Sequence, residues 1–358
     1  MDETPYRSLA RRLDSLPNGF PPTEDGSELR LLASLFTPEE ARLASQLRLT
    51  LETPAQIATR TGADPDLMGQ VLKSMARRGL IKAGRGEGGL GYGLLPFVVG
   101  IYELQVGCID AELARLFEDY YQNAFGRILE VAPPVHRVVP VGESVKAGME
   151  IRPYESAMEI VAAAQSWGVI DCICRKQKAL IGEPCEHPLD VCLVMSRKPG
   201  VFDNSQEVHA LTRAEAEATL ERASRAGLVH SVSNNQAGTW YICNCCTCSC
   251  GILRGLAELG IAGVVARAPF VNTVDEERCL GCEDCLEYCQ FGALSLDIFA
   301  QVDSRRCVGC GVCVPVCPEG ALVLVRRPDE EITPVPATEA DWMRLRATAR
   351  GIDLSQVA

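Results

Sequence analysis

The 358-residue sequence lacks any segment expected to cross a membrane or to direct secretion. Residues 1–20 contain no apolar signal core and no twin arginine, and no run approaches the roughly 18 to 20 apolar residues that a membrane-spanning helix needs. We therefore expect a cytoplasmic protein without a membrane span. In a reducing compartment, clustered thiols bind metal more often than they form disulfides.

The motifs of common enzymes are also missing. No catalytic triad, Walker motif, flavin motif or paired acid and base constellation appears. Gly84, Gly86 and Gly89 satisfy G-x-G-x-x-G, but no helix follows them to receive a pyrophosphate, so we interpret them as a turn. These absences leave enzymatic activity open and favour an electron-transfer protein, or a subunit of an oxidoreductase, over a stand-alone enzyme.

The chain has fewer basic than acidic residues. The chain has 35 Lys and Arg against 47 Asp and Glu, which gives a formal net charge of -12. An acidic surface repels phosphate backbones and favours basic patches on other proteins. We therefore expect a redox partner protein or an oxidoreductase complex as partner, with nucleic acid disfavoured but not excluded.

Cysteine, in contrast, is abundant, with 18 residues. Eight of them form two tandem runs of C-x2-C-x2-C-x3-C, which read C-L-G-C-E-D-C-L-E-Y-C and C-V-G-C-G-V-C-V-P-V-C. Thiolate sulfur is a soft ligand that suits iron–sulfur clusters. The alternatives are zinc sites or disulfides, but zinc usually takes two C-x2-C pairs set further apart.

Residues 274–325 resemble the bacterial two-cluster ferredoxins over the full length of that segment. The family expects Pro318 after the last cysteine, whereas Gln290 stands where the first repeat usually has proline. The apolar runs G-A-L-S-L and G-A-L-V-L correspond to the paired strands of that fold. The resemblance implies two 4Fe-4S clusters, one held by Cys279, Cys282, Cys285 and Cys317, and the other by Cys307, Cys310, Cys313 and Cys289.

Nine further thiols lie in the middle of the chain, namely Cys172, Cys174, Cys185 and Cys192, then Cys243, Cys245, Cys246, Cys248 and Cys250. They suffice for one or two further iron–sulfur clusters, of the 4Fe-4S type. Strand alternation predicts Cys246, Cys248 and Cys250 on one face, so adjacent Cys245 and Cys246 more easily serve different clusters. The simplest assignment gives one cluster to the cysteines of each group. An exchange of ligands between the two groups is the alternative.

Other interpretations of these nine thiols remain. They include a structural zinc knot, a set of reactive cysteines, and a loose resemblance to the substrate-reducing clusters of heterodisulfide reductases, whose paired cysteine pattern is absent. His187 and His230 are possible additional ligands, and a positive charge on Arg175 would raise a cluster's potential. Isolated Cys108 is expected to be a small buried residue.

The sequence predicts an α+β fold with a lead-in (1–28), a winged-helix-like domain (29–96), a cysteine-rich α/β domain (97–270), a ferredoxin domain (271–327) and a tail (328–358). Capping motifs at Thr37, Thr53 and Asp64 open three short helices that, with a glycine-rich hairpin, resemble a winged helix-turn-helix. In the middle domain we expect a helix capped by Asp110, a strand near His136 and a helix from residue 153 to about 167. The tail should form a short helix near Trp342.

The layout as a whole is similar to iron–sulfur proteins of anaerobic microbes known only as 4Fe-4S ferredoxins, which implies no substrate. The predicted function is a multi-cluster relay that passes low-potential electrons to or from a partner oxidoreductase. One alternative is a redox-sensing regulator whose winged helix reads DNA, although residues 1–100 contain equal numbers of basic and acidic residues. The other is a reductase with a substrate-binding cluster at residues 243–250.

Overall fold

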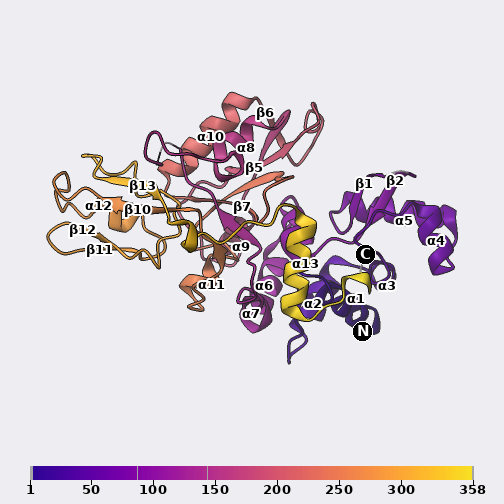
Figure 1. Ribbon diagram of the computed structural model, residues 1–358. Coiled ribbons are helices and arrows are strands. Elements are labelled where there is room, and N and C mark those ends of the chain that lie inside the picture. Colours follow the sequence, from indigo (N-terminus) through magenta and orange to yellow (C-terminus); the bar gives the residue numbers. More distant parts are fainter. Residues whose placement is uncertain (1–2, 87, 143, 357–358) are drawn as a thin grey trace. The chain divides into compact units, whose positions relative to one another are not determined.

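The computed structural model describes residues 3–86, 88–142 and 144–356 (Figure 1). The chain mixes helices and sheets, as expected for an α+β protein. It divides into two compact units, one of Met1–Val131, Leu180–Gly182 and Met343–Ala358, and one of Ala132–Ala179 and Glu183–Trp342. Among the described residues, none of the helices is both long and apolar enough to span a bilayer.

The first unit begins with five helices: α1 Thr4–Asp14, α2 Ser27–Leu35, α3 Pro38–Ala44, α4 Pro54–Thr61 and α5 Pro65–Arg77. Capping boxes at Thr37 and Thr53 are present, each with its hydroxyl accepting from the backbone N–H three residues later. Within the predicted lead-in, the described residues 3–28 include the buried side chains of Leu9, Leu13 and Phe20. Leu9 and Leu13 are four residues apart on one face of α1, which makes this helix part of the core.

A hairpin of β1 Lys82–Gly86 and β2 Gly89–Gly93 follows α5. Gly84 and Gly86 therefore lie in the first strand of a β-hairpin, and Gly89 begins the second. Glu52, ahead of α4, forms an isolated antiparallel bridge with Tyr92 in the second strand.

The rest of the first unit contains η1 Phe97–Ile101, η2 Glu103–Gln105, α6 Ala111–Tyr120, η3 Tyr121–Phe125, α7 Gly126–Ile128 and η6 Leu354–Gln356. Residues 97–131, which the sequence groups with the middle domain, lie in the same compact unit as residues 3–86. Asp110 caps α6 as expected, since its carboxylate accepts from the N–H groups of Glu112 and Leu113. Cys108 is exposed, so its expected burial is wrong, because it lies in the turn that precedes this cap.

The second unit is built on a seven-stranded sheet of order β6-β4-β5-β8-β7-β3-β9, in which only β3 and β9 are parallel. Its strands are β3 His136–Val138, β4 Ser166–Ile170, β5 Cys192–Ser196, β6 His209–Leu211, β7 Val229–Ser233, β8 Tyr241–Cys245 and β9 Val265–Ala266. The helices of this part are η4 Pro153–Glu155, α8 Ala157–Ala162, α9 Ile173–Leu180, α10 Arg213–Arg225 and α11 Arg254–Ala257. Helices α8 and α10 pack against the sheet through Val161, Leu193, Leu220 and Ile242.

The expected helix from residue 153 to 167 is wrong at its C-terminal end. Helix α8 stops at Ala162, and Trp167 lies in β4, which pairs with β5 on one side and β6 on the other. The Trp167 indole N–H donates to Val161 O over 2.8 Å. Two neighbouring strands override the local helical pattern, as tertiary context often does.

The C-terminal part of the second unit holds two antiparallel pairs. β10 Phe270–Val274 pairs with β13 Leu322–Arg326, and β11 Leu294–Leu296 pairs with β12 Ala300–Val302. The two apolar runs of the sequence thus become β11 and β13, each in a separate pair. The remaining helices are α12 Asp284–Glu287, η5 Asp329–Glu331 and α13 Glu339–Arg350, of which α13 is the helix expected near Trp342.

Candidate metal centres

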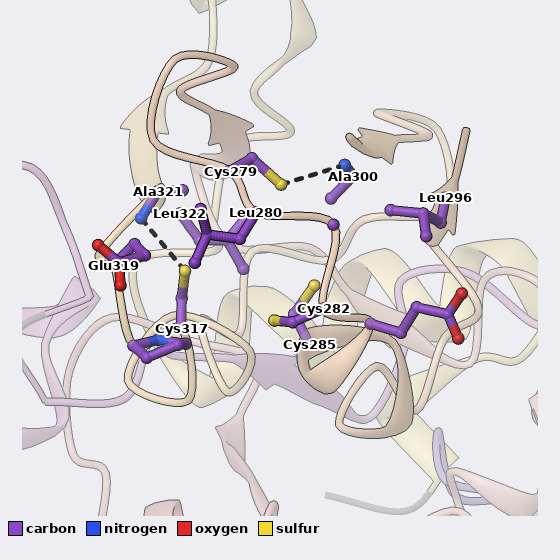
Figure 2. A pocket seen from close by; sticks show the side chains of 13 residues that line it. Cys279, Leu280, Cys282, Cys285, Leu296, Ala300, Cys317, Glu319, Ala321 and Leu322 are labelled. Carbon is purple, nitrogen blue, oxygen red and sulfur yellow. Dashed lines mark hydrogen bonds between the residues drawn. The ribbon is translucent and has the colours of Figure 1, made fainter. Parts of the chain in front are cut away.

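Two cavities lie among residues 272–324, and each is lined by four cysteines. The first encloses about 410 Å³ of empty space, part of it open to solvent, and is lined by Cys279, Cys282, Cys285 and Cys317 (Figure 2). The second encloses about 360 Å³ and is lined by Cys289, Cys307, Cys310 and Cys313. In each cavity, three cysteines come from one run and the fourth from the other. The structure thus brings together the same two sets that the ferredoxin resemblance implies.

Backbone N–H groups are directed at the sulfurs of the first cavity. Ala300 N donates to Cys279 Sγ over 3.4 Å, and Ala321 N donates to Cys317 Sγ over 3.2 Å (Figure 2). Such donors favour the thiolate form and tune the potential of an attached cluster.

The second cavity has an additional side-chain donor in Asn272. This residue is 4% exposed, and its Nδ2 donates to Cys313 Sγ over 3.2 Å while its backbone N donates to Cys307 Sγ over 3.5 Å. In the first cavity the residue that bonds Cys279 from its backbone is Ala300, which has no side-chain amide. The two cavities therefore offer their sulfurs different sets of donors.

The donors and walls of these cavities fit an iron–sulfur cluster. Apolar residues such as Leu296 and Leu322 surround the thiols of the first cavity. Burial raises the pKa of Cys285 to about 11 and that of Cys310 to about 12, so these thiols keep their protons until a soft metal displaces them. Clustered soft sulfur donors suit iron–sulfur chemistry. Residues 278–321 match the model of the 4Fe-4S dicluster domain.

The dicluster domain contains all eight cysteines of the two runs. Its match supports 4Fe-4S cluster binding by this segment and electron transfer as the general function of the chain. Comparisons with curated proteins and with solved structures give no match.

Gln290, the residue that departs from the ferredoxin pattern, joins the dicluster domain to the middle cysteines. Its Oε1 accepts from Thr247 N over 2.7 Å, and its Nε2 donates to Gly227 O and, over 3.4 Å, to Cys245 O. A proline at this position has no side-chain amide and makes none of these bonds. The departure therefore has a structural role, which is to connect Cys289 with the segment that follows β8.

Six of the nine middle thiols form a closed ring, which we call the six-thiol ring. Each thiol has two of the others as neighbours close enough to shift its pKa, in the order Cys172, Cys174, Cys250, Cys245, Cys243, Cys192 and back to Cys172. The pairing of β5 with β8, in which Leu193 lies opposite Ile242, explains why Cys192 meets Cys243. The ring combines cysteines from both sequence groups, so the simple partition by group does not hold.

Arg175 lies buried beside this ring, with 3% of its surface exposed. Its Nη1 donates to Asn244 O over 3.0 Å, while Nε and Nη2 are buried without a hydrogen-bond partner among the described residues. Burial alone lowers the pKa of Arg175, but the neighbouring Cys172 and Cys192 raise it above its ordinary value. A buried guanidinium is costly without an anion beside it, and metal-bound thiolates would supply that negative charge.

The other three middle thiols gather around a histidine. The ligand atoms of Cys185, His187, Cys246 and Cys248 all lie within 4.8 Å of one another, and we call them the Cys3His group. Burial opposes ionisation of Cys246, but His187 and Cys248 help to lower the pKa of its thiol to about 6. Cys246 belongs to this group and adjacent Cys245 does not, because β8 ends at Cys245 and the chain turns after it.

The two candidate histidine ligands have different neighbours. His187 lies with the cysteines, and its place two residues after Cys185 is the only signal of this in the sequence. His230 is buried, and its Nδ1 bonds the side chain of Asn244 rather than a thiol. Cys250 is also misplaced by strand alternation, because β8 ends at Cys245 and the chain then turns.

Proposed function

We propose that the chain is a multi-cluster iron–sulfur relay, in which the dicluster domain exchanges electrons with a further cluster held by the six-thiol ring. The observation that carries this proposal is the ring itself, in which six soft donors from both cysteine groups are neighbours of one another. Arg175 supports it, because its buried charge calls for an anionic centre at this place. Iron–sulfur clusters with thiolate ligands transfer single electrons at potentials that their surroundings set.

In the dicluster domain, the ligands of the proposal are the two sets of four cysteines that line the two cavities. When bound, a cluster in each cavity supplies a one-electron carrier. The protein's part is to exclude water with apolar walls and to donate N–H groups to the sulfurs. Asn272 gives one cavity an extra donor, so the two clusters should differ in potential.

Gln290 provides the connection between the dicluster domain and the six-thiol ring. Cys289 precedes it in the chain, and its Nε2 donates to the carbonyl of Cys245, a member of the ring. The peptide bond from Cys289 to Gln290 and the hydrogen bond from Gln290 Nε2 to Cys245 O thus connect a cysteine of the second cavity with a cysteine of the ring. The acidic chain would present its electrons to a partner oxidoreductase with a basic docking patch.

The test is iron and acid-labile sulfide per chain, measured on protein purified without oxygen. About twelve irons or more, with magnetically coupled signals in the electron paramagnetic resonance spectrum after reduction, would support the relay. About eight irons would contradict it, because the dicluster domain alone would account for them. The variant Cys243→Ser should lower the iron content, while the exposed Cys108→Ser should leave it unchanged.

Four exposed basic residues favour a second candidate for the first unit, a winged-helix domain that reads DNA. Lys73 and Arg77 are exposed on α5, and Lys82 and Arg85 are exposed on the hairpin. Arg78 does not add to this edge, because it bonds Glu40 over 2.7 Å. Retardation of DNA that depends on the oxidation state of the clusters would support a redox-sensing regulator, and no retardation in either state would exclude it.

A reductase that binds substrate at residues 243–250 is the third candidate, since the ring has more thiols than the four that a closed cubane needs. A spectral change on adding a thiol or a disulfide would reveal an open coordination site. An unchanged spectrum would favour the relay.

A further inference from the structure

The Cys3His group differs from the other cysteine sites in its size and in its donors. Its four ligand atoms come from two segments, the loop between α9 and β5 and the turn after β8. All four lie within 4.8 Å of one another, and Cys248 Sγ is 3.7 Å from His187 Nδ1. We propose that Cys185, His187, Cys246 and Cys248 bind a single zinc ion, separate from the iron–sulfur clusters.

The spacing fits one ion better than a cluster. A tetrahedral zinc with bonds of about 2.3 Å to sulfur and about 2.0 Å to nitrogen places its ligand atoms roughly 3.5–3.8 Å apart. The distance of 3.7 Å between Cys248 and His187 lies in that range. A cubane attaches each thiolate outside a different corner, which spreads four ligands further apart than this group allows.

The donor set is complete for a closed structural site. Three thiolates and one imidazole form one of the four-ligand combinations that hold zinc without an open position. Zinc has no redox chemistry of its own, so an ion here would not take part in electron transfer. Its role would be to stabilise the fold of the segments that surround the six-thiol ring.

Contacts already hold the two segments that the ion would join, among them the bond of Arg222 to Asp190 in the loop and the packing of Cys185 against a cluster that includes Cys246. Residues 181–191 form neither helix nor strand, and Pro184 and Pro188 lie within them. Cys246 and Cys248 lie on either side of Thr247, whose backbone N–H bonds Gln290 of the dicluster domain. A single ion would therefore fix the loop to the segment that carries both the ring and the contact with the dicluster domain.

Neighbouring side chains suit a zinc site with three thiolates. Ser249 Oγ donates to Cys185 Sγ over 3.3 Å, and Arg175 Nη1 lies 3.9 Å from Cys246 Sγ. Three thiolates and Zn²⁺ leave one net negative charge, and the guanidinium of Arg175 offsets it. Partners of this kind orient the ligands and stabilise the bound metal.

The experiment measures zinc and iron together in the complete protein, purified without oxygen and treated with a chelator to remove loosely held metal. We expect one zinc per chain in addition to the iron. X-ray absorption at the zinc edge should show three sulfur neighbours and one nitrogen neighbour, at about 2.3 Å and 2.0 Å.

Variants separate this site from the clusters. His187→Ala and Cys248→Ser should lose most of the zinc and keep the iron. His187→Cys should keep the zinc with four sulfur neighbours, which makes it informative even if His187→Ala fails to fold. The matched control is His209→Ala, an exposed histidine on β6, which should change neither metal.

Three results would overturn the proposal. They are wild-type protein without zinc after the chelator, His187→Ala that retains full zinc, and Cys248→Ser that loses about four irons, as expected if these thiols hold a cluster. The proposal does not rest on the relay, because an iron count of about eight would refute the relay and leave the zinc stoichiometry to decide this site.

Discussion

Replacing Asn272 with leucine should lower the reduction potential of the cluster in the second cavity. The side-chain amide donates to Cys313 Sγ over 3.2 Å, and such a donor stabilises the reduced state more, because the reduced cluster carries one more negative charge. Leucine has nearly the same size and no donor. Asn272 Oδ1 accepts no hydrogen bond among the described residues, so its removal leaves no donor there without its acceptor.

The size of the shift follows from the one bond that is lost. A hydrogen bond to a charged group contributes about 1.5–3 kcal/mol. If about a third of that free energy distinguishes the two oxidation states, the reduced state loses roughly 0.5–1 kcal/mol. For a one-electron couple this corresponds to a fall of about 20–40 mV.

The assay is a potentiometric titration followed by electron paramagnetic resonance, on wild-type and variant protein with equal iron content. Thr273→Val is the control, since the Thr273 hydroxyl donates to Val323 O and not to a thiol. An unchanged or raised potential in Asn272→Leu, or an equal shift in the control, would refute the assigned role of Asn272.

Three further predictions concern stability, each measured by anaerobic urea unfolding. Gln290→Ala should lower the free energy of unfolding by about 1–2 kcal/mol by removing its bonds to Thr247 N and Gly227 O, whereas the exposed Gln122→Ala should change little. Arg346→Met should lower it by about 3–5 kcal/mol, because the buried guanidinium bonds three backbone carbonyls, of Pro17, Ile128 and Val131. Arg344→Met, at an exposed position on the same helix, is its control, and equal losses would contradict the role of Arg346. Burial lowers the pKa of His136 to about 4, below its unfolded value of about 6.5, so the unfolded state binds its proton first and stability falls as the pH drops from 6.5 toward 4. Between pH 7 and pH 5 this residue should account for about 2 kcal/mol of that loss, and His136→Asn should not show it.

The sequence alone determined the features of this protein that depend on residues close together in the chain. The capping boxes at Thr37 and Thr53 use residues three positions apart, so they can be recognised without knowledge of the fold, and both are present. The eight cysteines of the dicluster domain have a spacing that a short segment sets by itself. Their family match and their two shared cavities follow from that spacing.

Only the tertiary structure decided how the nine middle cysteines divide. Cys192 and Cys243 are far apart in sequence and meet because β5 pairs with β8, while the turn after β8 carries Cys246 toward the loop that holds Cys185. Pairing between strands is a long-range property, and no spacing in the chain encodes it. The same reason explains why Trp167 lies in a strand between two others instead of ending a helix, and why the function of Gln290 becomes visible only in its contact with Thr247.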